Sequence, residues 1–203
     1  MDISKSRPDL RRLLNEITRS PRDEHPARIG QLGTVHQHGI KLALATDTPT
    51  TPPDKYTCFM HAFDLVNSRP VIEIARTFAV GENETYPTGA FVAYLVDRHL
   101  SEILHEEAQN GDIVVYSCAA GIAHAGKFSG GKVISKWGTG LLWEHAVDEV
   151  PSAYGDDVSF FHAPPWPIAE QAFVAYARQR EGADVVDLLL GPLAKSRAGE
   201  PQA

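Results

Sequence analysis

The chain has 203 residues, of which 43% are hydrophobic and 22% are charged, as is usual for a globular domain. The formal net charge of -7 argues against a general nucleic-acid binder or a binder of anionic membranes, because such proteins present a basic face. The two cysteines, Cys58 and Cys118, are too few for a disulfide scaffold, and their spacing does not suggest structural zinc.

The first residues, Met1 to Pro8, are polar and lack the apolar core of a signal peptide. No run of apolar residues reaches the length of a transmembrane helix. We therefore expect a cytoplasmic protein that binds neither nucleic acid nor membrane, although export without a cleaved signal is compatible with this sequence. Because cytoplasmic thiols stay reduced, we also expect both cysteines to be free.

Three parts of the chain differ in composition. Residues 1–28 are rich in charged residues and proline and predict an N-terminal arm with a helix from Pro8 to Thr18. Residues 29–193 predict a single α+β domain, and residues 194–203 predict a flexible tail.

Partial alternation of apolar residues over 29–46 favours a strand or hairpin. On such a strand His36 and His38 would share one face, but a metal site needs further ligands and none lies nearby in the sequence. We therefore predict no metal and no cofactor.

The middle of the chain predicts helices. Helical spacing of apolar residues begins at Cys58, after Pro52 and Pro53, and predicts a helix to about Asn67 or Ser68, ended by Pro70. Residues 71–79 fit either a helix or a strand, and residues 88–107 fit a helix.

The second half predicts an antiparallel meander followed by a helix. Strands are expected near 112–117, 122–128, 132–137 and 157–162, with a hairpin turn at Gly130-Gly131. A C-terminal helix is expected over 168–190, with a break at Gly182. Helices followed by a meander indicate the α+β class rather than alternating βαβ units.

Cys58 is the strongest candidate for chemistry. A cysteine in the first turn of a helix lies beside unpaired backbone N–H groups and the positive end of the helix dipole, which favour a thiolate. The alternative is a small buried hydrophobe, which is what most lone cysteines are.

His124 could serve as the base for such a thiolate. It lies in the second predicted strand between two alanines, which leave room for a neighbouring helix end. A third polar group must hold the imidazole tautomer, and Ser135 or His145 could provide it. The alternative for His124 is a hydrogen-bonded core histidine.

Taken together, these motifs resemble the NlpC-like branch of the papain-like cysteine peptidases. The resemblance covers roughly residues 54–162 and includes Tyr56-Thr57-Cys58 opening an apolar helix, the Gly111-Asp112 turn before an apolar strand, and His124-Ala125-Gly126 before a glycine hairpin. It implies N-terminal helices packed on a small antiparallel sheet, Cys58 as nucleophile, His124 as base, a third residue near Ser135, and hydrolysis or acyl transfer on amide bonds, often in cell-wall peptides.

The sequence also departs from that family. Thr57-Cys58-Phe59-Met60 stands where the family often has Asp-Cys-Ser-Gly, and the segment from Ser135 to Gly155 has no counterpart in the general pattern. In that segment Lys136, Trp137 and His145 are candidates to line a substrate groove, while core packing is the alternative for Trp137 and Trp143.

Two functions follow. The first is a Cys–His hydrolase or acyltransferase acting on a peptide or amide, with the Cys58 N–H and Tyr56 as oxyanion donors. The second is a catalytically inactive domain of the same fold that serves as a binding or interaction protein.

Overall fold

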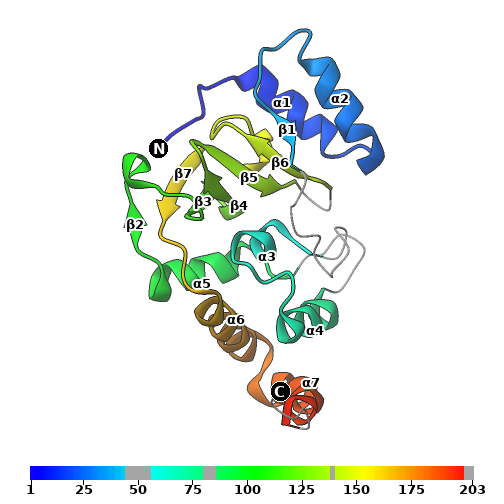
Figure 1. Cartoon of the computed structure of the whole chain (residues 1–203), viewed down its shortest axis with the longest axis vertical. Helices are drawn as coiled ribbons and strands as arrows, with labels where there is room; N and C mark the ends of the chain where they lie inside the picture. Colours follow the sequence, from blue (N-terminus) through cyan, green and yellow to red (C-terminus); the bar gives the residue numbers. More distant parts are fainter. Residues whose placement is uncertain (44–55, 80–85, 138–139, 199–203) are drawn as a thin grey trace.

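The computed structural model describes residues 1–43, 56–79, 86–137 and 140–198, which form an antiparallel sheet with helices on both faces (Figure 1). The sheet has seven strands in the order β1-β6-β5-β4-β3-β7-β2. The strands are β1 (Lys41–Leu42), β2 (Glu102–Ile103), β3 (Ile113–Cys118), β4 (Gly121–Ser129), β5 (Lys132–Lys136), β6 (Leu142–His145) and β7 (Asp157–Phe161). This confirms the α+β class and the expected antiparallel meander.

Seven α-helices and three short 3-10 helices complete the described part of the chain. The α-helices are α1 (Pro8–Ile17), α2 (His25–Leu32), α3 (Cys58–Ala62), α4 (Arg69–Phe78), α5 (Gly89–His99), α6 (Trp166–Glu181) and α7 (Ala183–Ala198). The 3-10 helices are η1 (Arg22–Glu24), η3 (His105–Glu107) and η4 (Ser152–Tyr154). In Figure 1, α1 and α2 lie at one end beside β1 and β6, and α4, α6 and α7 lie toward the other.

Several helix boundaries differ from the sequence prediction. The strand or hairpin expected over 29–46 is wrong for its first part, because α2 runs to Leu32 and the strand that follows has two residues; residues 44–46 lie outside the described residues. The helix starting at Cys58 ends at Ala62, and Asp64 has a left-handed φ of 59° that turns the chain away. Pro70 begins α4 rather than ending the preceding helix.

Two further boundaries concern the later helices. The helix expected over 88–107 stops at His99 and is followed by edge strand β2. The predicted break at Gly182 is confirmed, since α6 ends there with a φ of 102°. Residues 194–198, expected to be part of a flexible tail, belong to α7, and residues 199–203 lie outside the described residues.

The two faces of the sheet are covered by different parts of the chain. Helices α3 to α6 pack on one face around a large apolar cluster that includes Phe91, Val115, Ala125 and Phe173. We call this the helical face. On the other face α1 packs against Trp137 and Trp143, and the segment from Val147 to Tyr154 covers the remainder. We call this the N-terminal face.

The N-terminal 28 residues are tied closely to the sheet. The Met1 ammonium donates to the Val158 carbonyl at 2.7 Å, beside an isolated bridge between Asp2 and Asp157. The guanidinium of Arg11 is 2% exposed and donates to the carbonyls of Ile3, Val150 and Gly155 and to the Asp156 carboxylate. The predicted N-terminal arm therefore packs as an integral part of the N-terminal face.

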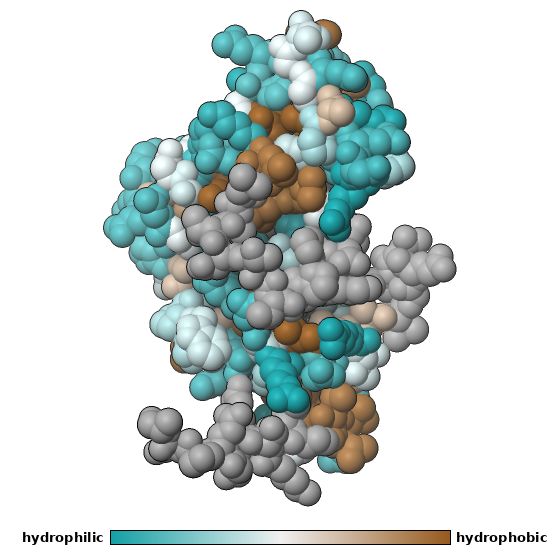
Figure 2. Space-filling view, turned by 45° about the vertical axis from the view of Figure 1, so that its right-hand side comes forward, coloured by the Kyte–Doolittle hydropathy of each residue, from teal (hydrophilic) through white to brown (hydrophobic). Residues whose placement is uncertain are grey.

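The hydropathy of the surface is mixed. The face in Figure 2 is mainly hydrophilic, with a few separate hydrophobic areas. No helix in the described ranges is both long enough and apolar enough to span a bilayer. Both cysteines are free, as the sequence predicted.

Candidate functional site

Cys58 is the first residue of α3, as expected. The Thr57 side chain caps this helix by accepting a hydrogen bond from the Met60 N–H at 3.2 Å, which explains why the helix starts here. Burial raises the pKa of the Cys58 thiol to about 11, although the Ala125 and Phe59 backbone N–H groups and the Lys136 ammonium act in the opposite direction. A helix of one turn among apolar neighbours therefore leaves the thiol protonated at neutral pH.

His124 lies on the N-terminal face of β4, whereas Cys58 packs against the helical face. Its ring stacks on Tyr154 with centroids 4.0 Å apart and contacts Tyr116 at 5.6 Å. The next residue, Ala125, belongs to the apolar cluster that contacts Cys58, and successive residues of a strand point to opposite faces. The structure therefore does not bring the expected Cys58–His124 pair together.

His124 is also a poor proton acceptor in this setting. The side chain is 1% exposed, and its Nε2 has no hydrogen-bond partner among the described residues. Burial lowers the pKa of His124 well below its ordinary value, and the nearby His145 and His61 act in the same direction. The imidazole is therefore neutral and held by aromatic contacts.

His61, which the sequence reasoning missed, is the imidazole that shares a helix with Cys58. Residues three apart on a helix lie on the same side, so His61 lies one turn from the thiol. Its Nε2 is buried and has no hydrogen-bond partner in the described ranges. Burial lowers the pKa of His61 to about 4, with the Lys127 ammonium as a second cause. The spacing from Cys58 was the signal that could have identified it.

Ser135 and His145 form a closed network on the N-terminal face. Nδ1 of His145 lies 2.7 Å from the Ala146 carbonyl, which can only accept, so Nδ1 carries the proton. Nε2 of the neutral ring then accepts from the Ser135 hydroxyl at 2.8 Å, and Trp137 Nε1 donates to the same hydroxyl oxygen at 3.1 Å. Ser135 and His145 have no exposed surface, so they do not line a substrate groove.

Trp137 likewise is a core residue. It is 1% exposed and packs against Trp143 beneath α1, with ring centroids 5.6 Å apart. The prediction that Lys136, Trp137 and His145 line a groove is wrong for the described structure, since Lys136 and His145 have no exposed surface. Core packing, the alternative considered for Trp137, is confirmed.

Lys136 and Tyr56 do approach the thiol. Lys136 Nζ lies 4.6 Å from the centre of the Tyr56 ring and donates to the Gly140 carbonyl at 2.6 Å. Both residues are buried, and burial raises the pKa of the Tyr56 phenol. Of the predicted residues, Lys136 therefore lies near Cys58, and its ammonium contacts the Tyr56 ring. His61, which was not predicted, lies on the same helix as the thiol.

Two glycine motifs on which the family resemblance rests have structural explanations. A Cβ on Gly126 would lie 2.7 Å from Ser135 Cβ, so glycine permits β4 and β5 to pack closely. The Asp112 carboxylate accepts from the backbone N–H groups of Gln109 and Ala163 and so fixes the turn before β3. These motifs do not by themselves indicate catalysis.

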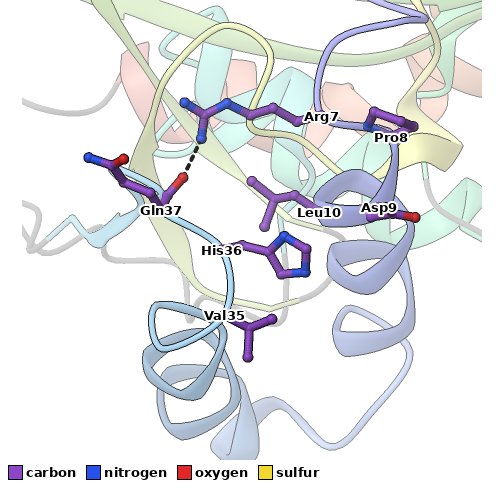
Figure 3. Close-up of a pocket in the computed structure, with 7 residues that line it drawn as sticks. All are labelled: Arg7, Pro8, Asp9, Leu10, Val35, His36 and Gln37. Atoms are coloured by element: carbon purple, nitrogen blue, oxygen red, sulfur yellow. Dashed lines mark hydrogen bonds between the residues drawn. The ribbon is translucent and has the colours of Figure 1, made fainter.

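A pocket of about 290 Å³ lies between the start of α1 and residues 35–37 (Figure 3). Its cation, Arg7, is already bound to the Gln37 carbonyl at 2.6 Å and to the Glu149 carboxylate at 2.8 Å.

His38 Nε2 donates to the Ile29 carbonyl and His38 Nδ1 accepts from the Ile40 N–H, so neither nitrogen is available for a metal. The described residues contain no group of three or more potential metal ligands.

A larger groove of about 580 Å³ lies between α5 and α6. It includes Tyr94 and Arg98 from α5 and Tyr176 and Arg180 from α6. The two helices lie far apart in the sequence, and no motif marks either one, so the sequence carried no signal for this site.

Comparison with known proteins found no match to any family model, curated protein or solved structure.

Proposed function

We propose that this protein is a divergent, catalytically inactive relative of the NlpC-like papain-like fold and serves as a binding or interaction protein. The chain order supports the relationship, because a helix beginning at a cysteine precedes an antiparallel sheet with His-Ala-Gly on its second long strand. The observation that carries the proposal is that Cys58 and His124 contact opposite faces of the sheet.

The titration of the two groups supports the same conclusion. A working thiolate–imidazolium pair needs a thiol pKa below that of its base, so that the proton moves to the imidazole. Burial raises the pKa of Cys58 to about 11 and lowers that of His124, which is the opposite order. At neutral pH both groups are uncharged, and no thiolate is available to attack a substrate.

Alkylation by iodoacetamide, followed residue by residue with mass spectrometry, tests this proposal. Cys58 should react more slowly than the exposed Cys118 at pH 8, and its rate should continue to rise toward pH 11. The His124→Ala substitution should leave the shape of that profile unchanged, and alkylation of the urea-unfolded protein controls for intrinsic reactivity. A Cys58 rate that is half-maximal below pH 7 and shifts in the His124 variant would overturn the proposal.

A second candidate is a thiol hydrolase or acyltransferase acting on a peptide or amide, favoured by the place of His61 one turn from Cys58. In that reaction the thiol proton passes to His61 Nε2 as sulfur bonds to the carbonyl carbon. The C–N bond then breaks, the amine leaves with the proton, and water or an acceptor amine releases the acyl group. Reaction with p-nitrophenyl acetate should then acetylate Cys58 faster than Cys118, and His61→Asn should abolish that preference while His124→Ala retains it.

A further inference from the structure

The groove between α5 and α6 is lined by residues that suit a particular kind of partner. Arg98 of α5 and Arg180 of α6 contribute two guanidinium groups, and both side chains are about half exposed, at 46%. Arg180 lies near the start of α5, since its Nη1 is 3.5 Å from Thr88 Oγ1. Arg98 lies in the last turn of α5. The Arg98 guanidinium itself lies over the Tyr94 ring, and Tyr94 is six residues from Thr88. The two cations are therefore about 9 Å apart along a helix that rises 1.5 Å per residue.

Both guanidinium groups are oriented by aromatic residues. Arg98 Cζ lies 4.2 Å above the centre of the Tyr94 ring, and Arg180 Nη1 donates to the Tyr176 hydroxyl at 2.8 Å. Arg180 Nε also lies 3.1 Å from the Glu181 carboxylate. Each guanidinium has five N–H donors in a fixed plane, so the contacts among the described residues still leave Nη donors for a ligand. A guanidinium that is already oriented loses less side-chain entropy when it binds a carboxylate.

The middle of the groove is apolar and open. Ala90 and Ala93 are exposed and leave space along α5, and the Tyr94 and Tyr176 rings are 5.7 Å apart beside them. Tyr176 is 6% exposed and also packs on Phe91, so this wall is rigid. Because both arginines and both alanines face solvent, the groove suits an extended chain better than an enclosed small molecule.

We propose that the α5–α6 groove binds an extended acidic peptide segment, with one carboxylate at Arg98, another at Arg180, and an apolar residue between them. Because an extended strand advances about 3.3 Å per residue, the two acidic residues should be about three positions apart. This proposal rests on the proposed binding function and names its partner, and it does not depend on the chemistry of Cys58.

Asp97 places a negative charge in the same groove, next to Arg98. Its carboxylate lies 3.9 Å from Arg98 Nη1, a long contact that partly offsets the arginine charge. Replacing Asp97 with Asn should therefore strengthen binding of an acidic peptide. A neutral peptide should not respond to this substitution.

Fluorescence polarisation with labelled peptides tests the proposal. The probes are short peptides with two glutamates separated by one, two or three leucines, matched with glutamine versions. We expect saturable binding of the glutamate peptides, best at the separation of two leucines, at least tenfold weaker binding by the double variant Arg98→Glu, Arg180→Glu, and weakening with added salt. The double variant Arg12→Glu, Arg76→Glu makes the same change in net charge at two exposed positions outside the groove, and it is the control.

A second variant tests the groove without changing charge. Ala93→Trp should fill the apolar middle and weaken binding while far-UV circular dichroism stays unchanged. Equal binding by glutamate and glutamine peptides, no saturable binding at millimolar peptide, or equal loss in the control double variant would reject the groove as an acidic-peptide site. None of these results would alter the alkylation profile of Cys58. The peptide experiment can therefore reject the groove while the proposed binding function stands, and the alkylation experiment tests that function independently.

Discussion

The two faces of strands β4 and β5 differ sharply in their chemistry. Toward the helical face these strands present Ala125 and Lys136 near the Cys58 thiol, and Lys127, which pairs with Asp64. Toward the N-terminal face they present His124 and Ser135, which are enclosed by aromatic rings and hydrogen bonds. Residues adjacent in sequence are thus separated by the full thickness of a sheet when they alternate along a strand.

The faces also gain their stability differently. The helical face is held by apolar and aromatic packing, as the cluster around Phe91 illustrates. The N-terminal face is held in large part by buried polar groups that find partners, such as Arg11 and the Ser135–His145 pair. Substitutions on the two faces should therefore lower the free energy of unfolding for different physical reasons, which unfolding experiments can separate.

The largest effect is expected from Phe91→Ala on the helical face. Phe91 has no exposed surface and contacts the Phe173 and Tyr176 rings at 5.1 and 5.6 Å. Loss of the ring should lower the free energy of unfolding in urea by about 3–5 kcal/mol, since it removes apolar contacts and leaves a cavity. Phe91→Leu should cost clearly less, and equal costs for the two variants would contradict a packing role.

Arg11→Ala on the N-terminal face should cost about 3 kcal/mol. The substitution leaves the carbonyls of Ile3, Val150 and Gly155 without their buried donor. The neighbouring Arg12→Ala removes an exposed pair with Glu16 and should cost below about 0.5 kcal/mol in the same urea experiment. Similar costs for the two arginines would show that the N-terminal face does not depend on buried polar bonds.

Acid should weaken the protein through its buried histidines. Burial lowers the pKa of His145 from 6.5 to about 4, so below pH 6.5 the unfolded chain binds a proton that the folded chain does not. Stability is therefore complete above pH 6.5 and falls as the pH drops toward 4. His145 alone should account for a loss of about 2 kcal/mol between pH 7 and pH 5.

The substitution His145→Gln tests this contribution, because an amide can keep both hydrogen bonds but does not titrate. Urea unfolding at several pH values should give a shallower decline for the variant than for the native protein. Parallel curves for the two proteins would mean that His145 is already protonated in the folded state or is not buried as described.

Ser135→Ala should have the smallest effect of the four, about 1–2 kcal/mol. It removes the acceptor of Trp137 Nε1 and the donor to His145 Nε2, two buried groups that would be left unsatisfied. As a comparison, Ser20→Ala removes a single hydrogen bond to the Ile17 carbonyl in a partly buried site and should cost less. If Ser20→Ala costs as much, the network adds nothing beyond one ordinary hydrogen bond.

The fold class and the main strands could be predicted from the amino-acid sequence, because they depend on local patterns. Alternation of apolar residues, the Gly130-Gly131 hairpin and the late break at Gly182 are all local signals, and the structure follows them. Thr57 as a helix cap also acts within one turn, so the start of the Cys58 helix was predictable. The end of that helix was not predictable, because packing at Phe63 and the turn at Asp64 override the helical spacing of its apolar residues.

Which candidate residues contact one another depends on long-range packing and could not be predicted from the sequence. The spacing of Cys58 and His124 along the chain was compatible with a catalytic pair, but the register of β4 directs His124 toward Tyr154 and away from the thiol. A shift of one residue in a strand exchanges its two faces, and no local pattern fixes that choice here, because both faces are buried. The groove between α5 and α6 depends in the same way on long-range packing, since its two arginines are distant in sequence and are brought together only by the fold.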